Sequence, residues 1–344
     1  MEKKQYLKHT VEHLDITRFD PRPLIEQFGS MAFQARNLAR AARIYDRMLA
    51  DRECTVMLCL AGSLFSAGLK KVVCDLVEHD MVDVIISTGA IIVDQDFFEA
   101  LGFRHYRGSP AADDDDLMKN RIDRIYDTFI DEDELRECDL TVHRIAESLP
   151  PRPYSSREFI AHMGRYLEEQ GGDSASVVLA AYRKGVPVFV PAFSDSSAGF
   201  GLVYHQWQGK QRGAPVLTID SVKDFLELTR VKVRSGETGL FMIGGGVPKN
   251  FAQDVTVAAD ILGQYVPMHK YAVQITVADE RDGGLSGSTL REAHSWGKVD
   301  KGNEQLVFCE ATIGMPLVAG HAFHQGNWRG REGKALNKML DEQS

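Results

Sequence analysis

The stretch from Thr55 to Ala90 decides the fold class. It begins with the continuous apolar run Thr55-Val-Met-Leu-Cys-Leu60, continues through Ala61-Gly62-Ser63, and ends with Val82-Asp-Val-Ile-Ile-Ser87 and the turn Thr88-Gly89-Ala90. An unbroken apolar run is typical of a strand that is buried on both faces. Two such strands joined by a helix form a parallel βαβ unit. The sequence therefore predicts an α/β fold with a doubly wound, mostly parallel sheet and helices on both faces.

The same alternation of strands and helices resumes after a charged, loop-rich excursion over residues 103–150. Further strands are predicted over residues 186–190, 239–243, 271–277 and 305–309, and helices over residues 31–49, 121–133, 155–170, 174–184, 221–233 and 312–323. We interpret residues 1–50 as an N-terminal helical extension, residues 51–330 as a single α/β domain and residues 331–344 as a polar C-terminal tail. The chain beyond Gln325 is expected to be frayed.

Composition narrows the class of protein. The chain has 344 residues, 44% of them hydrophobic, and a net charge of -9. The acidic balance argues against non-specific nucleic-acid binding and suits a cationic substrate. Five cysteines without a CxxC spacing fit a reducing compartment. No apolar run reaches membrane-spanning length and the N-terminus lacks an apolar leader. We expect a cytoplasmic protein that binds neither nucleic acid nor a membrane.

Small residues follow several of the predicted strands. Three glycines, Gly244-Gly245-Gly246, come directly after the buried run that ends at Ile243. Such turns let a ligand approach the backbone, and amides at a helix start can bind phosphate. Tight packing of helix on strand explains them equally well, and the chain contains no GxGxxG fingerprint. The aspartate run at 113–116 is interpreted as a helix N-terminus or solvated loop, and no metal site is expected.

The segment Ser286-Gly-Ser-Thr-Leu-Arg-Glu-Ala-His-Ser-Trp-Gly-Lys298 is the candidate catalytic element. A lysine that acts as a nucleophile must spend time as a neutral amine, which requires a desolvating environment. Trp296 supplies apolar surface, and Glu292 lies four residues earlier, on the same face of a helix. A packed helix terminus is the alternative interpretation from these residues alone.

This segment resembles the active-site segment of deoxyhypusine synthases, NAD-dependent enzymes that transfer an aminobutyl group from spermidine to a protein lysine. The resemblance extends from about Thr55 to Phe323. Its motifs recur in order as STGA at 87–90, PAFSDSS at 191–197, MIGGGVPK at 242–249, SWGK at 295–298 and FCEAT at 308–312. In that family the lysine that matches Lys298 forms the imine intermediate. The resemblance implies a catalytic role for Lys298, Glu292 and Trp296, and a Rossmann-like NAD-binding catalytic domain over residues 51–330.

The resemblance also implies which residues contact NAD. Small residues would cradle the cofactor and acids would accept from ribose hydroxyls. The matching positions are Gly62, Ser63, Ser66, Thr88, Gly89, Ala90, Asp94 (glutamate in the eukaryotic enzymes), Asp195, Gly244, Gly245, Gly246, Asp282, Gly283, Glu310 and Ala311. Family enzymes form tetramers with active sites shared between paired subunits, so a homotetramer with sites at the dimer interface is implied as well.

The polyamine site departs from the family pattern at three positions. Glu292 and Trp296 are retained as substrate-binding residues, whereas Asn250 stands in place of a catalytic-pocket histidine. Phe200 and Leu285 stand where the family has aspartates that bind ammonium groups, and each change removes a charge-assisted bond to a cationic amine. Asn250 cannot transfer protons near neutral pH, and His294 is a possible substitute, with a packed or solvent-facing role as the alternative.

Three hypotheses follow from these observations. The first is an NAD-dependent transferase that moves an aminobutyl group from spermidine or putrescine to a small amine, with a homospermidine-type product. The motifs GGGVPKN and SDSSAG support it, because they resemble a bacterial-type branch in which the protein substrate is not expected. The second is true deoxyhypusine synthesis on a protein lysine. The third is a non-catalytic regulator that binds NAD or a polyamine.

Overall fold

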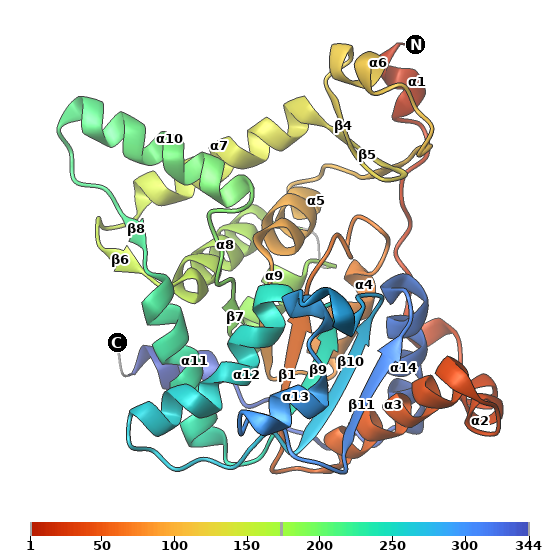
Figure 1. Cartoon of the computed structure of the whole chain (residues 1–344). Coiled ribbons are helices and arrows are strands. Elements are labelled where there is room, and N and C mark those ends of the chain that lie inside the picture. Colours follow the sequence, from red (N-terminus) through yellow and green to blue (C-terminus); the bar gives the residue numbers. More distant parts are fainter. Residues whose placement is uncertain (1, 173–174, 343–344) are drawn as a thin grey trace.

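A six-stranded parallel sheet forms the centre of the molecule (Figure 1). The computed structural model describes residues 2–172 and 175–342. The strands lie in the order β11-β10-β9-β1-β2-β7. Their bounds are β1 Thr55–Leu60, β2 Val84–Ser87, β7 Val188–Phe189, β9 Thr238–Ile243, β10 Tyr271–Thr276 and β11 Glu304–Phe308. The chain runs outward from β1 in both directions, so the strand order reverses between β1 and β9. The predicted doubly wound α/β fold is confirmed.

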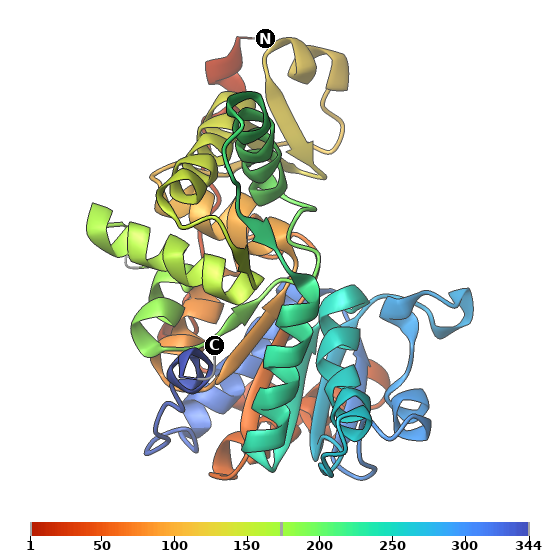
Figure 2. The same ribbon diagram turned by 90° about the vertical axis from the view of Figure 1, so that its left-hand side faces the viewer.

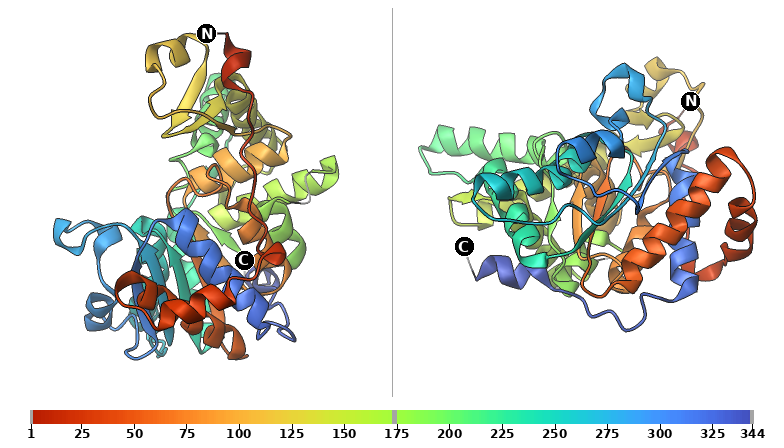
Figure 3. Two further views of the ribbon diagram at one scale, coloured as in Figure 1. Left: turned by 90° about the vertical axis from the view of Figure 1, so that its right-hand side faces the viewer. Right: turned by 60° about the horizontal axis from the view of Figure 1, so that its bottom comes forward.

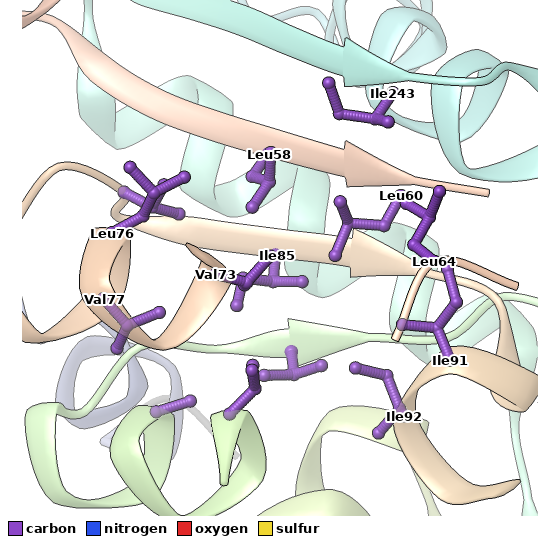
Figure 4. Close-up of a cluster of buried hydrophobic side chains, with 14 of the residues drawn as sticks. Leu58, Leu60, Leu64, Val73, Leu76, Val77, Ile85, Ile91, Ile92 and Ile243 are labelled. Atoms are coloured by element: carbon purple, nitrogen blue, oxygen red, sulfur yellow. The ribbon is translucent and has the colours of Figure 1, made fainter. Parts of the chain in front are cut away.

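Helices cover both faces of this sheet because successive strand side chains point to opposite sides. Leu58 and Ile243 belong to the core on one side, whereas Met57 and Met242 belong to the core on the other. Figure 4 shows Leu58, Ile85 and Ile243 on their strands, with side chains of a covering helix beside them. The first face is covered by α3 Phe33–Ala50, α4 Lys70–Glu78, α8 Ser156–Gln170, α9 Val177–Lys184 and α14 Ala311–Gln325, and the second by α11 Ser221–Ser235, α12 Gly246–Ile261, α13 Leu290–Ser295 and α15 Leu336–Asp341.

The two ends of the chain differ from the expected extension and tail. Helix α3 is part of the layer on the sheet, since the buried ring of Tyr45 stacks on Phe241 with 4.4 Å between ring centroids. At the other end, Leu340 is fully buried and Arg331 pairs with Asp83 at 2.7 Å. The expectation of a frayed chain beyond Gln325 is therefore wrong, because a few apolar residues in a polar segment suffice to dock it.

The helix predicted over residues 121–133 is also wrong. This segment forms a hairpin of β4 (Ile122–Ile125) and β5 (Thr128–Asp131), with β3 (Tyr106–Arg107) on the other side of β5. Tyr126 takes the left-handed conformation at φ 53° in the turn. Phe129 is buried and packs edge-on against Tyr6 at 5.7 Å. Contacts with the distant N-terminus therefore decide a segment whose own apolar spacing suits a helix.

An arm projects from the edge of the sheet at which its strands end (Figures 1 and 2). It consists of the hairpin and two helices that pack along each other, α7 (Glu132–Ser148) and α10 (Ser197–Arg212). The remaining elements are α1 Lys3–Tyr6, η1 Ile16–Arg18, α2 Arg22–Gly29, η2 Ala90–Phe97, α5 Phe98–Ala100, α6 Asp114–Lys119, β6 Pro153–Tyr154, β8 Thr218–Ile219, η3 Glu280–Asp282 and η4 Leu285–Gly287. Asp113 caps α6, so the aspartate run forms a helix N-terminus, one of the two interpretations given above.

The N-terminal segment runs along the molecule from the arm to the base of the sheet (Figure 3). A buried carboxylate fastens it on the way: Glu99 contacts Lys70 Nζ at 2.6 Å, His13 Nε2 at 2.7 Å and His105 Nδ1 at 2.7 Å. These partners hold the pKa of Glu99 well below its usual range. Among the described residues, no helix is long and apolar enough to cross a membrane.

Candidate active site

A cavity of about 500 Å³ opens around Lys298 between α12 and α13. Helix α12 begins at the glycine turn after β9. Helix α13 is capped at its N-terminus by Thr289, whose hydroxyl accepts a hydrogen bond from the backbone N–H of Glu292. Glu292, Trp296 and Lys298 all line the cavity. The structure therefore brings the three predicted catalytic residues together. The remaining lining residues are Phe225, Asn250, Gln253, Asp254, Val257, Ala258, Ile261, Leu285, Ser288 and Ala293.

The amine of Lys298 is shielded but not isolated from charge. Its side chain is only 12% exposed, and Nζ lies 5.1 Å from the centroid of the Trp296 ring. Trp296 is itself 64% exposed, so its ring forms the side of the cavity that separates the lysine from solvent. Nζ also lies 2.5 Å from Oδ1 of Asp254 on α12. Sequence reasoning missed Asp254, although its position one helical turn after Asn250 was a usable signal.

A second lysine beside this cavity, Lys249, was also missed. It is fully buried in the first turn of α12 and donates to the carbonyl and, at 2.9 Å, to the hydroxyl of Ser288. Burial lowers its pKa to about 8, against the opposing effect of the Glu292 charge. Lys249 therefore ties the segment before α13 to the glycine turn. Gln274 on β10 adds to this tie by donating to the carbonyls of Gly244 and Ser286, both at 3.1 Å.

Two of the three departures from the family pattern lie in the cavity. Asn250 and Leu285 line it, whereas Phe200 lies on α10, is 67% exposed and does not line this cavity. His294 does not line the cavity either. Its Nδ1 lies 2.8 Å from the carbonyl oxygen of Val299, which closes the turn after α13. His294 thus packs locally, in agreement with the alternative given above.

The residues predicted to contact NAD gather along one edge of the sheet. Every one of them follows the carboxyl end of a strand, and all six strands of the sheet contribute. Parallel strands end at the same edge, and ligands of such sheets bind where the strand order reverses. Here that place is between β1, followed by Gly62, and β9, followed by Gly244. Tertiary structure thus unites residues that are far apart in the sequence.

The glycines at this edge divide into two kinds. A side chain at Gly62 or Gly246 would find no atom nearer than 3.8 Å, although both residues have a positive φ. Their backbones therefore leave an open cradle at the reversal point. In contrast, an added Cβ would meet Ser196 Oγ at 2.5 Å from Gly89 and Ser286 Cα at 2.5 Å from Gly245. These two glycines are explained by close packing of the chain itself.

A second cavity, of about 940 Å³, lies beside the same edge. Ser66 and Glu310 of the predicted cofactor residues line it, together with Glu12 of the N-terminal segment and Arg107 of β3. Thr88, at the end of β2, has a buried hydroxyl without a hydrogen-bond partner. A buried polar atom of this kind is expected to find a partner in a bound ligand or water. The open cradle and the unpaired hydroxyl lie at the edge where the resemblance implies a dinucleotide, and Ser66 and Glu310 connect that edge to this cavity.

Asp94 is the predicted cofactor residue with the most unusual environment. Its Oδ1 accepts the backbone N–H of Ser197 at 2.7 Å, at the start of α10. Burial raises its pKa to about 7, and the nearby carboxylates of Asp139 and Asp195 act in the same direction. A carboxyl group that changes protonation near neutral pH is a common feature of functional sites.

One group of side chains within the described ranges is spaced to hold a metal ion. The ligand atoms of His143, Glu147 and His205 lie within 4.8 Å of one another, between α7 and α10. Glu147 already lies 2.6 Å from His205 Nδ1 and pairs with Arg212 at 2.9 Å. These contacts occupy the carboxylate, and the expectation that the protein has no metal site stays a prediction.

Fold and site together define a doubly wound α/β protein with a shielded lysine near the carboxyl edge of its sheet. The family model of deoxyhypusine synthase matches residues 23–322. A deoxyhypusine synthase-like protein of Chlorobaculum tepidum is 62% identical over 342 residues, covering 99% of this chain and 97% of the relative. One from Coxiella burnetii is 56% identical over 343 residues, again covering 99% and 97%. A protein of Methanosarcina mazei named as a probable deoxyhypusine synthase 2 is 42% identical over 313 residues, covering 91% and 89%.

This chain belongs to the deoxyhypusine synthase family. The crystal structure of an Entamoeba histolytica protein described as a candidate deoxyhypusine synthase superposes with a TM-score of 0.61 at 19% identity, covering 91% of this chain and 97% of that one. At this identity the superposition bears on the fold alone. The resemblance inferred from the sequence motifs is confirmed.

Proposed function

We propose that the protein is an NAD-dependent transferase that moves an aminobutyl group from spermidine or putrescine to an amine acceptor through an imine on Lys298. The observation that carries this proposal is the placement of the Lys298 amine, 12% exposed, in one cavity with Glu292 and Trp296. A shielded lysine beside a carboxylate suits covalent amine chemistry, because the carboxylate can bind the cationic donor and the amine can attack it.

NAD, when bound, supplies the oxidising power that makes the carbon beside the donor's nitrogen electrophilic. The residues proposed to hold it are those along the carboxyl edge, with Gly62 and Gly246 as the open cradle. The chain itself then provides three functions. Lys298 holds the transferred fragment, Trp296 covers the lysine with an apolar wall, and Glu292 orients the donor's charged nitrogen.

The acceptor is proposed to be a small amine, giving a homospermidine-type product. The cavity of about 500 Å³ is the size of a small-molecule site. Asn250 and Leu285 line it in place of the family's histidine and aspartate, so its inner surface carries fewer charged groups than the family pattern. True deoxyhypusine synthesis on a protein lysine is the alternative transferase. A regulator that binds NAD or a polyamine without turnover is the non-catalytic alternative, and the shielded lysine counts against it.

A homotetramer with active sites at the dimer interface is part of the proposal. Phe200, Val203 and Trp207 expose between 62% and 68% of their surface along one side of α10. An apolar stripe of this kind is typical of a protein–protein contact. Light scattering after gel filtration tests the assembly, and fractionation of cells tests the expected cytoplasmic location.

The test of the proposed reaction is intact-mass analysis after borohydride quenching. Protein would be incubated with NAD and either spermidine or putrescine, with Lys298→Arg as the matched variant. An adduct of one aminobutyl group on the native protein alone would establish the lysine imine and identify the donor. Absence of an adduct with either amine, while NAD still binds, would refute imine transfer from these donors and favour the regulator.

A further inference from the structure

Asp254 is the carboxylate that contacts the candidate nucleophile. It lies on α12, and its Oδ1 is 2.5 Å from Lys298 Nζ. Its other oxygen, Oδ2, accepts a hydrogen bond of 2.6 Å from Nδ2 of Asn250, one helical turn earlier. Both oxygens are thereby fixed in direction. All three residues line the same cavity as Glu292 and Trp296.

An amine that attacks an electrophilic carbon must first give up a proton, and an adjacent carboxylate stabilises the charged form. The contact between Asp254 and Lys298 is also a direct route for a lysine proton to leave. Asn250 has no titratable proton, and the ring of His294 is directed to the carbonyl of Val299. The geometry points to Asp254 as the proton-transfer residue of the Lys298 site, with Asn250 as its positioning residue.

The step follows from the proposed function and balances without a further reactant. The Lys298 nitrogen forms a bond to the imine carbon of the oxidised donor, and the bond from that carbon to the leaving nitrogen breaks. Two protons pass from the lysine nitrogen to the leaving nitrogen, and no electrons are gained or lost. Asp254 is proposed to carry these protons one at a time, because its Oδ1 is within hydrogen-bond distance of the attacking atom.

Asn250 and Asp254 together then account for the missing histidine. A histidine at position 250 could transfer protons itself, whereas an asparagine can only donate and accept hydrogen bonds. The bond from Asn250 leaves Oδ1 of Asp254 free to face Lys298. The spacing of four residues on α12 places both groups on one face of the helix.

The test uses a small aldehyde as the probe, so that it does not depend on NAD or on the identity of the donor. Butanal forms an imine with a lysine amine and releases water, and a borohydride quench at timed intervals reduces the imine to a stable secondary amine. The rate of labelling at Lys298 would be measured by peptide mass spectrometry over a series of increasing pH values, and the plateau rates of the variants would be compared. Asp254→Asn is expected to lower the plateau rate by about 100-fold or more.

Two further variants separate proton transfer from folding. Asn250→Ala leaves the carboxylate in place but removes its tether, and is expected to lower the plateau rate by about 10-fold with unchanged thermal stability. Asp260→Asn, an exposed position on the same helix, should match the native rate. Equal plateau rates for native protein and Asp254→Asn would overturn the inference. Labelling by butanal that depends on Asp254, without any adduct from polyamine and NAD, would support it and refute the proposed function instead.

Discussion

Asp94→Asn is expected to stabilise the free protein at neutral and alkaline pH and to leave it unchanged in acid. Burial raises the pKa of Asp94 to about 7 in the folded protein, whereas an aspartate in an unfolded chain titrates at about 3.9. Between these values the folded protein binds a proton that the unfolded chain has released. The free energy of unfolding of the native protein therefore falls as the pH rises through this window.

The size of the effect follows from the two pKa values. Their separation corresponds to at most about 4 kcal/mol at pH values above both. Asparagine keeps an oxygen for the Ser197 N–H, which Asp94 accepts at 2.7 Å, and it carries no charge. We expect the stability difference between Asp94→Asn and native protein to be near zero at about pH 4 and to reach about 2–4 kcal/mol at about pH 8.

Urea unfolding at a fixed protein concentration measures this difference. Asp260→Asn serves as the control, because it removes an exposed carboxylate and should change stability by less than about 0.5 kcal/mol at every pH. A difference for Asp94→Asn that stays constant across the pH range, or a variant that is less stable at pH values above neutral, would refute the reasoning. The same variant is expected to bind NAD more weakly, since Asp94 is one of the proposed contacts.

Three further variants probe the surroundings of the site. Glu99→Gln removes the carboxylate that pairs with the buried amine of Lys70 and should lower the free energy of unfolding by about 3–5 kcal/mol in urea unfolding. Because the pKa of Glu99 is lowered in the folded protein, the difference between native protein and variant should shrink as the pH falls into the acidic range. Gly245→Ala places a Cβ 2.5 Å from the backbone of Ser286 and should lower the free energy of unfolding by about 1–3 kcal/mol. A variant that binds NAD as native protein does and melts at the same temperature would contradict this prediction. Lys249→Met removes an amine whose pKa burial lowers to about 8. Between about pH 8 and about pH 10.5 the folded native protein has lost a proton that its unfolded chain still binds, so its free energy of unfolding should rise by up to about 3 kcal/mol relative to that of the variant.

The sequence by itself determined the fold class and the family. Buried parallel strands are apolar on both faces. Runs such as Thr55–Leu60 and Tyr271–Thr276 can therefore be predicted as strands without knowledge of the segments that pack against them. The Lys298 segment can likewise be identified from the sequence, because its motif lies within a few consecutive residues. Capping is local as well, which explains why a helix N-terminus was one of the two interpretations of the aspartate run.

Only the tertiary structure decided what depends on distant partners. The segment over residues 121–133 forms a hairpin because Phe129 packs against Tyr6. The C-terminal residues pack against the rest of the protein because the side chain of Leu340 is buried there. The pairing of Lys298 with Asp254 joins residues 44 positions apart in the chain. The spacing of Asp254 from Asn250 indicates a shared helix face, but only the fold brings that face to Lys298. Gly89 and Gly245 were likewise ambiguous in the sequence, because the atoms that crowd them belong to Ser196 and Ser286. Helix and strand propensities act over a few residues, whereas burial, charge pairing and steric exclusion are settled by whichever segments the fold brings into contact.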